Sequence, residues 1–320
     1  ERVVTPQEFS VIDQSCLPLS LQFSYDEYRE APSVGFAVQE IAVGRFASAC
    51  ISLQKSRSVI DNTALAGLHI WCLSQDNNLS AAQQLLNTAI AEFEVDQHLA
   101  YSGAIIHEQS GNHQLAHSLY SDLFALNGEP MILEACARTA LASSQSQRCL
   151  DCLDQLLLAT EITPKHLTMR AAAFAQLDRY LESMALLVHM LEDWPNDGEL
   201  LLQTAFVAYD YAAASSSLEL YVDAAILLRR ITELDPQNAA VFLPLARCYA
   251  ASGDFNESTL AFMRCLELEP NNVAASHELS DLYMTYNDKS LAQKILRQLL
   301  NQPISPVARQ QTTHKLSQLD

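Results

Sequence analysis

The sequence predicts an all-α protein built from repeated antiparallel helix pairs, and three observations lead to this prediction. Glycine supplies 8 of the 320 residues, about 2.5% against a usual share near 7%, so the tight turns of a β-sandwich or barrel are scarce. With 11 prolines and 49% hydrophobic residues, this composition favours helices. Several prolines also recur at near-constant intervals, which is typical of a repeat array without one large core.

The N-terminal segment 1–30 differs from the rest of the chain. Leu19, Leu21, Phe23 and Tyr25 alternate with polar residues, and this period of two is strand-like. We therefore expect the segment to form an N-terminal arm that is either extended and lies on the array or only partly ordered.

Residues 31–303 are expected to form about eight helix pairs. In the first half, turns are indicated at Gly44-Arg45, Asp76-Asn77-Asn78, Gly111-Asn112 and Ser143-Ser144-Gln145. Helical runs with small residues at regular offsets follow these turns, as Ala116 follows Gly111-Asn112. Each pair buries too little surface to be stable alone, so stability must come from stacking.

The clearest unit is 239–272, AAVFLPLARCYAASGDFNESTLAFMRCLELEPNN. A turn at Gly253-Asp254 separates its two helices, Ala246 and Ser258 are the small residues at the helix crossing, and Pro270 closes the unit. The interval from Pro236 to Pro270 equals that from Pro130 to Pro164. This unit resembles the tetratricopeptide repeat, whose period of about 34 residues matches both intervals. The resemblance is strong over 164–303 and implies a right-handed superhelical solenoid.

Two later segments depart from the period. The interval from Pro195 to Pro236 exceeds the repeat period by roughly two helical turns, which indicates an insertion near 209–221. This insertion either lengthens two helices by about one turn each or forms a protruding, tyrosine-rich loop suited to contacts. Residues 304–320 are expected to form a C-terminal capping helix, with Leu316 and Leu319 facing inward and Lys315 outward.

Composition excludes several classes of function. The formal charge is −19, with 19 basic and 38 acidic residues, so neither nucleic acid nor an anionic membrane is an expected partner. No continuous run of about 18 apolar residues predicts a membrane span, and no signal peptide is evident.

Eight scattered cysteines fit buried free thiols in a reducing cytoplasm. The chain begins at Glu1, which fits a fragment or a processed product.

No motif predicts catalysis, a metal or a cofactor. Cys149 and Cys152 form a CxxC, but it lies inside a predicted helix without a second ligand pair, so we interpret both as structural thiols. His113 and His117 lie four residues apart on one helix face and could jointly bind a metal. The same face belongs to the predicted helix crossing, so we do not predict a metal site there. There is no phosphate-binding glycine loop and no recognisable nucleophile motif.

The resemblance implies that the first helix of each pair lines a concave groove that holds a partner peptide. By position, the candidate partner-binding residues are His98, Tyr101, Arg138, Lys165, Met169, Gln203, Leu243, Arg247, His277 and Asp281. Each of them could instead be a solvated helix residue. Related proteins that hold the C-terminal carboxylate of heat-shock chaperones use a Lys/Asn clamp, whereas this chain carries Glu278 and Asp281 there, which would repel a carboxylate.

We therefore predict a non-catalytic scaffold, adaptor or chaperone that holds a protein or peptide in its groove. The alternative is a sensory or oligomerisation module of a larger protein, such as a transcription regulator. An enzyme is the third and least favoured class. A homodimer through the N-terminal arm or the 209–221 insertion remains open.

Overall fold

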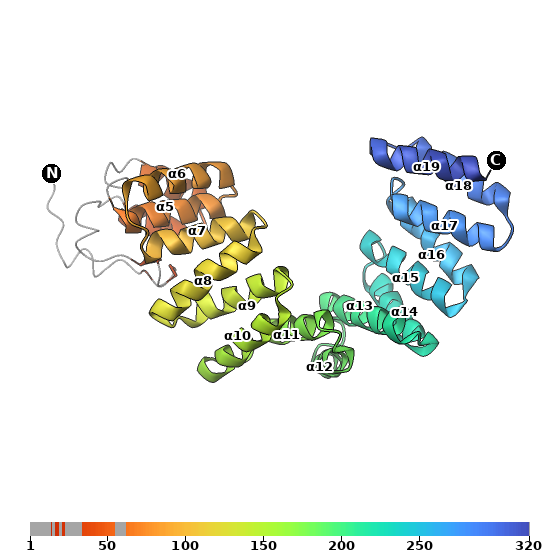
Figure 1. The fold of residues 1–320 in the computed structure, drawn as a ribbon, viewed down its shortest axis with the longest axis horizontal. Helices are drawn as coiled ribbons and strands as arrows, with labels where there is room; N and C mark the ends of the chain where they lie inside the picture. The colour runs from red at the N-terminus through yellow and green to blue at the C-terminus, as the bar shows by residue number, and fades with distance from the viewer. Residues whose placement is uncertain (1–13, 15–16, 19–20, 23–33, 55–61, 320) are drawn as a thin grey trace. The chain divides into compact units, whose positions relative to one another are not determined.

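The computed structural model describes residues 14, 17–18, 21–22, 34–54 and 62–319 (Figure 1). Within these residues the chain forms seventeen helices and no strand. Successive helices pair through short turns, so the predicted all-α solenoid of helix pairs is confirmed. The chain divides into two compact units, Glu1–Ala173 and Phe174–Asp320, which are described separately.

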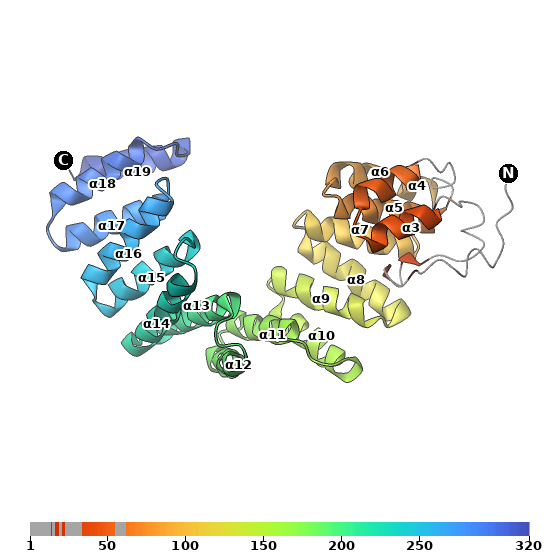
Figure 2. The same cartoon turned by 180° about the vertical axis from the view of Figure 1, so that it is seen from behind.

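Unit 1 contains four helix pairs and most of one further helix. Figure 2 shows the first pair packed beside the second. The helices are α3 (Val34–Ala42), α4 (Phe46–Gln54), α5 (Thr63–Gln75), α6 (Leu79–Glu92), α7 (Gln97–Gln109), α8 (His113–Asn127), α9 (Pro130–Ala142), α10 (Ser146–Ala159) and α11 (Pro164–Gln176), the last of which continues just beyond the unit.

Unit 2 contains the second helix of the fifth pair, three complete pairs and a final helix. The helices are α12 (Tyr180–Asp193), α13 (Gly198–Ser215), α14 (Leu218–Leu234), α15 (Ala239–Ser252), α16 (Phe255–Leu268), α17 (Val273–Thr285), α18 (Lys289–Leu300) and α19 (Pro306–Gln318). Together the described residues contain eight pairs followed by one helix.

Local sequence explains where the helices begin and end. Asn62 caps α5 by accepting hydrogen bonds from the backbone N–H groups of Ala64 and Leu65, and Asp254 caps α16 through the N–H of Glu257. These side chains satisfy donors that the first turn leaves without intrahelical partners. Gly253 ends α15 with φ of +84°, a left-handed conformation that glycine adopts without a steric penalty.

The helices of a pair approach closely where their facing residues are small. Ala246 and Ser258 are both fully buried, and the Ser258 hydroxyl donates to the Ala246 carbonyl over 2.9 Å. Successive first helices also approach closely, because a Cβ at Gly67 of α5 would lie 2.9 Å from the carbonyl oxygen of His98 of α7. Larger side chains, including Tyr120, fill the gaps and are almost completely buried.

The insertion near 209–221 lengthens two helices. α13 has 18 residues and α14 has 17, whereas α15 and α16 have 14 each. The turn between them is short, with Ser216 in the left-handed conformation, and Tyr209 packs edge-to-face against Tyr221 with ring centroids 5.5 Å apart. The segment therefore forms no protruding loop, which removes the feature that suggested a contact site there.

The C-terminal helix differs in detail from its prediction. α19 buries Ala308 and Thr312, while Leu316 is only partly buried. Lys315 does not face outward, because its ammonium lies 2.7 Å from a carboxylate oxygen of Asp281 on α17. The prediction for Lys315 was therefore wrong, because this side chain contacts α17.

Most of the predicted N-terminal arm, including Leu19, Phe23 and Tyr25, lies outside the described residues. At the described positions, Leu17 and Leu21 are buried and belong to the core of unit 1. The N–H of Leu21 donates to the carbonyl of Pro18 over 2.8 Å. The described part of this segment thus makes a turn and supplies two core side chains.

Candidate protein-binding groove

A hollow of about 480 Å³ lies across the first helices of successive pairs in unit 1, and we call it the unit 1 groove. Helices α5, α7, α9 and α11 all contribute to it, together with one tyrosine of α8. Its lining residues are Trp71, Gln75, Tyr101, Ile105, Glu108, Gln109, Tyr120, Met131, Glu134, Ala135, Arg138 and Lys165.

The floor of the unit 1 groove is aromatic and aliphatic. Tyr101 packs edge-to-face against Tyr120 with centroids 6.1 Å apart, and both rings are buried, as are Trp71 and Ile105. Burial, followed by the nearby charge of Glu129, raises the pKa of Tyr101 to about 12. Its phenol is therefore neutral at physiological pH. The groove also contains an exposed apolar side chain, Met131, with 49% of its surface accessible.

Ion pairs join neighbouring repeats along the groove. Arg138 of α9 donates to both carboxylate oxygens of Glu108 of α7, which also accepts a hydrogen bond from the Tyr120 hydroxyl over 3.0 Å. The hydrogen bond to Glu108 raises the pKa of Arg138. Because the guanidinium bonds both carboxylate oxygens at once, the pair fixes the Arg138 side chain in one orientation.

Lys165 of α11 and Glu134 of α9 form a second ion pair between neighbouring repeats. The Lys165 ammonium donates to Glu134 over 2.6 Å, and a ring nitrogen of His166 lies 3.4 Å from the other carboxylate oxygen. Burial opposes ionisation of Glu134, but the hydrogen bond and charge of Lys165 outweigh it and lower the pKa of this carboxyl. The cationic charges of Arg138 and Lys165 are thus balanced within the protein.

Unit 2 also contains a bidentate ion pair between two successive first helices. Arg247 of α15 donates to both carboxylate oxygens of Glu278 of α17, over 2.9 and 2.6 Å. Asp281 pairs with Lys315, and a ring nitrogen of His277 lies 2.9 Å from the Thr312 hydroxyl. The predicted positions His277 and Asp281 are therefore contacted by the C-terminal helix α19.

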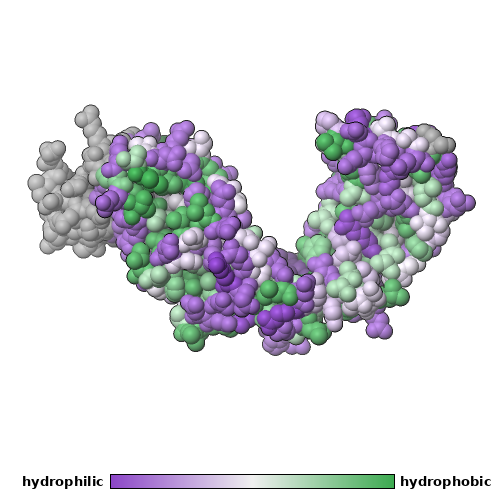
Figure 3. Space-filling model, in the orientation of Figure 1, coloured by the Kyte–Doolittle hydropathy of each residue, from purple (hydrophilic) through white to green (hydrophobic). Residues whose placement is uncertain are grey.

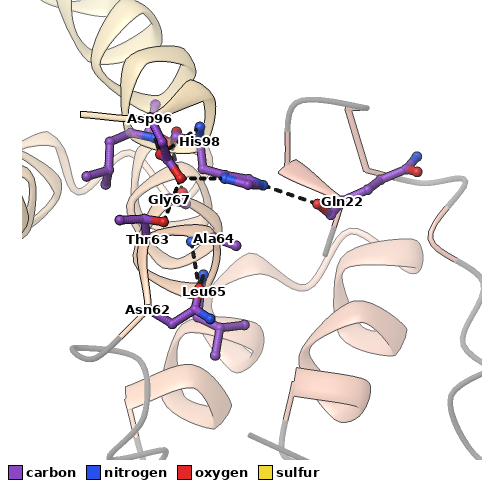
Figure 4. Close-up of polar contacts among 10 residues, drawn as sticks. Gln22, Asn62, Thr63, Ala64, Leu65, Gly67, Asp96 and His98 are labelled. Atoms are coloured by element: carbon purple, nitrogen blue, oxygen red, sulfur yellow. Dashed lines mark hydrogen bonds and ion pairs between the residues drawn. The ribbon is translucent and has the colours of Figure 1, made fainter. Parts of the chain in front are cut away.

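His98 has structural contacts on both sides of its ring (Figure 4). One nitrogen lies 3.0 Å from the Asp96 carboxylate and the other lies 3.2 Å from the carbonyl oxygen of Gln22. Asp96 also accepts a hydrogen bond from Thr63 over 2.6 Å, and His98 is buried. This cluster ties α5 and α7 to residue 22 of the N-terminal segment.

The structure brings three of the ten predicted site residues into one hollow: Tyr101, Arg138 and Lys165. His98 and Met169 are buried in unit 1 outside the lining of this groove. In unit 2, Gln203 and Leu243 are partly buried on the first helices α13 and α15.

Sequence reasoning missed several lining residues, and the repeat interval could have found some of them. Arg138 follows Ile105 by 33 residues, and Ile105 follows Trp71 by 34. Extending the repeat period backward from Arg138 would therefore have indicated both Ile105 and Trp71. Exposure of an apolar side chain alone does not locate the groove. Hydrophobic and hydrophilic residues both occur on the face of the molecule drawn in Figure 3, and Leu158 is 90% exposed outside the groove.

The described residues also include the CxxC of α10 and the paired histidines of α8. No group of three or more metal-ligating side chains occurs among them. Burial raises the pKa of Cys149 to about 12, so this thiol is protonated at neutral pH, whereas a hydrogen bond with Cys136 lowers the pKa of Cys152. None of the described helices combines the length and apolar character needed to cross a membrane.

Comparison with known proteins identifies the fold. No model of a known protein family matches the sequence, and no curated protein matches it significantly. Among solved structures, a tetratricopeptide repeat protein from Parabacteroides merdae shares 16% identity, with 81% of this chain and 99% of that one covered and a TM-score of 0.57. Yeast Tom70 shares 11% identity over 97% of this chain and 67% of its own, with a TM-score of 0.54.

These likenesses, together with the helix pairs and their small-residue crossings, establish a protein with a tetratricopeptide-repeat-like fold. At such low identity they define the fold, while the chemistry of binding must be argued from this chain's own residues.

Proposed function

We propose that this protein is a non-catalytic interaction scaffold and that the unit 1 groove holds an extended segment of a protein partner. The observation that carries the proposal is the composition of the groove. Aromatic and aliphatic side chains form the floor, and polar side chains from successive repeats surround it. Hollows with an apolar floor and a few fixed polar groups are the usual form of a binding site.

The ion pairs indicate which kind of segment fits. Glu108 and Glu134 already neutralise Arg138 and Lys165, so the described lining of the groove offers no free cation to a carboxylate or phosphate. An apolar or aromatic side chain of the partner would instead pack beside Met131. The glutamines of the lining supply amide donors and acceptors suited to the backbone of an extended chain. An adaptor and a chaperone would both use such a groove.

Site-specific crosslinking tests this proposal. A photoreactive amino acid placed at Met131 should capture one or a few discrete proteins in cells of the native host. The matched control is the same amino acid at Leu158, which is more exposed but lies outside the groove. Identical crosslinks from both positions, or none from Met131, would contradict the assignment of the groove.

A further inference from the structure

A second hollow, of about 710 Å³, lies in unit 2 where the α15–α16 turn meets the α17–α18 turn. We call it the Tyr286 hollow. Its lining includes three aromatic rings, Phe255, Tyr283 and Tyr286, and two carboxylates, Asp254 and Asp288. None of its described lining residues is a lysine or an arginine.

Two of the three aromatic rings contact each other. Phe255 packs edge-to-face against Tyr286 with centroids 4.4 Å apart, while Tyr286 remains 50% exposed. Tyr283 is partly buried, and its burial together with the charge of Asp288 raises its pKa. The ring of Tyr286 is therefore accessible at the hollow, and the carboxylate of Asp288 is close enough to Tyr283 to influence its ionisation.

Both carboxylates are oriented by their helices. Asp254 accepts a hydrogen bond from the N–H of Glu257 through Oδ1. Asp288 accepts hydrogen bonds from the N–H of Leu291 and the hydroxyl of Ser290, also through Oδ1. These contacts leave the second oxygen of each carboxylate for a ligand. The negative charges also offset the partial positive charge of the two helix N-termini.

A hollow at the same repeat position in unit 1 shows that this chemistry is not a requirement of the fold. That hollow lies at the α8 N-terminus and is lined by Asn112, His113 and Ser143. Asn112 holds the N-cap position of α8 as Asp254 holds that of α16, and Ser143 ends α9 as Tyr286 ends α17. The repeat thus forms both hollows, but of these two only the one in unit 2 combines aromatic rings with carboxylates.

We propose that the Tyr286 hollow binds an arginine side chain from a basic segment of a partner protein. A planar guanidinium stacks on an aromatic face and donates to carboxylates through a fixed fork of N–H groups. The protein's net charge of −19 favours the approach of a basic segment. This site is distinct from the unit 1 groove, and neither proposal depends on the other.

Calorimetry with the full chain and the peptide acetyl-(Gly-Arg)4-amide tests the proposal. The double substitution Asp254→Asn/Asp288→Asn should weaken binding by roughly tenfold, because it removes the charges, while asparagine still caps both helices. The control Asp197→Asn removes the charge of another helix-capping aspartate outside the hollow and should leave the affinity unchanged. Tyr286→Ser, which installs the side chain found at Ser143, should also weaken binding.

Two further arms identify the chemistry. The citrulline peptide, which has nearly the same shape as the arginine peptide but no charge, should not bind measurably. Amide NMR shifts induced by the arginine peptide should concentrate at 254–260 and 283–288. Equal binding of the citrulline peptide, undiminished binding by the double variant, or loss of affinity in Asp197→Asn equal to that in the double variant would each overturn the proposal.

Discussion

Arg138 and Glu108 join two successive repeats through a bidentate ion pair, with one guanidinium nitrogen 3.0 Å from Oε2 of the carboxylate. The side chain of Glu108 is 17% exposed and that of Arg138 is 42% exposed. The pair lies in the unit 1 groove, and the same kind of contact joins Arg247 to Glu278 in unit 2. Ionic contacts between first helices therefore contribute to stacking as well as to the chemistry of the groove.

Arg138→Ala should destabilise the protein by about 1–2 kcal/mol, because it leaves the carboxylate of Glu108 partly buried without its partner. Urea denaturation monitored by circular dichroism measures this change. The matched control is Lys165→Ala, whose ammonium side chain is 60% exposed and should contribute less than about 1 kcal/mol. Equal losses in the two variants would show that the Arg138 pair has no special role.

Gly67→Ala should be destabilising by about 1–3 kcal/mol, since the new methyl would meet the backbone of His98 at 2.9 Å. Gly198→Ala is the control, because its Cβ would have no atom within 4 Å, and it should be neutral or slightly stabilising. Thermal unfolding of both variants checks this prediction. A stable Gly67→Ala protein would mean that α5 and α7 are farther apart than described.

Ala246→Leu should also cost about 1–3 kcal/mol, because Ala246 is fully buried at a helix crossing. Ala251→Leu places the same side chain on an exposed position of the same helix and should change stability little. Chemical denaturation of the two variants compares them directly. If Ala246→Leu unfolds at the same denaturant concentration as the wild type, the register of the repeat is wrong.

Asp96 should make the stability of unit 1 depend on acid. Burial opposes its ionisation, but hydrogen bonds from His98 and Thr63 outweigh burial and lower its pKa from 3.8 to about 2. Because the folded state has the lower pKa, this contribution is complete above about pH 4 and is lost as the pH falls toward about 2. Asp96→Asn should remove this part of the pH dependence. Unfolding midpoints measured across the acid range for both proteins test the prediction, and identical pH profiles would contradict it.

The fold was predictable because it rests on local signals. Short polar or glycine-containing segments and the spacing of prolines located the turns, and small residues such as Ala246 located the helix crossings. The long interval between Pro195 and Pro236 located the insertion, although spacing alone could not distinguish longer helices from a loop. The long α13 and α14 resolve that choice.

The candidate site was harder to predict because its contacts join residues almost one repeat apart along the chain. Helix position indicated that Tyr101 and Arg138 could line a groove, but nothing in the local sequence showed that Glu108 pairs with Arg138. Apolar periodicity likewise misplaced Lys315, since this residue meets Asp281 through an ion pair. The contacts of His98 also include Gln22, which lies far away in the sequence.

Binding at the unit 1 groove is the central claim, and one affinity comparison tests it most directly. A partner captured from Met131 should be purified and titrated against the wild type, Met131→Asp and Leu158→Asp. Both substitutions place a charge on an exposed side chain, so the fold should persist. We predict that Met131→Asp weakens binding by at least roughly tenfold, while Leu158→Asp does not. Equal affinity for all three proteins would contradict the account.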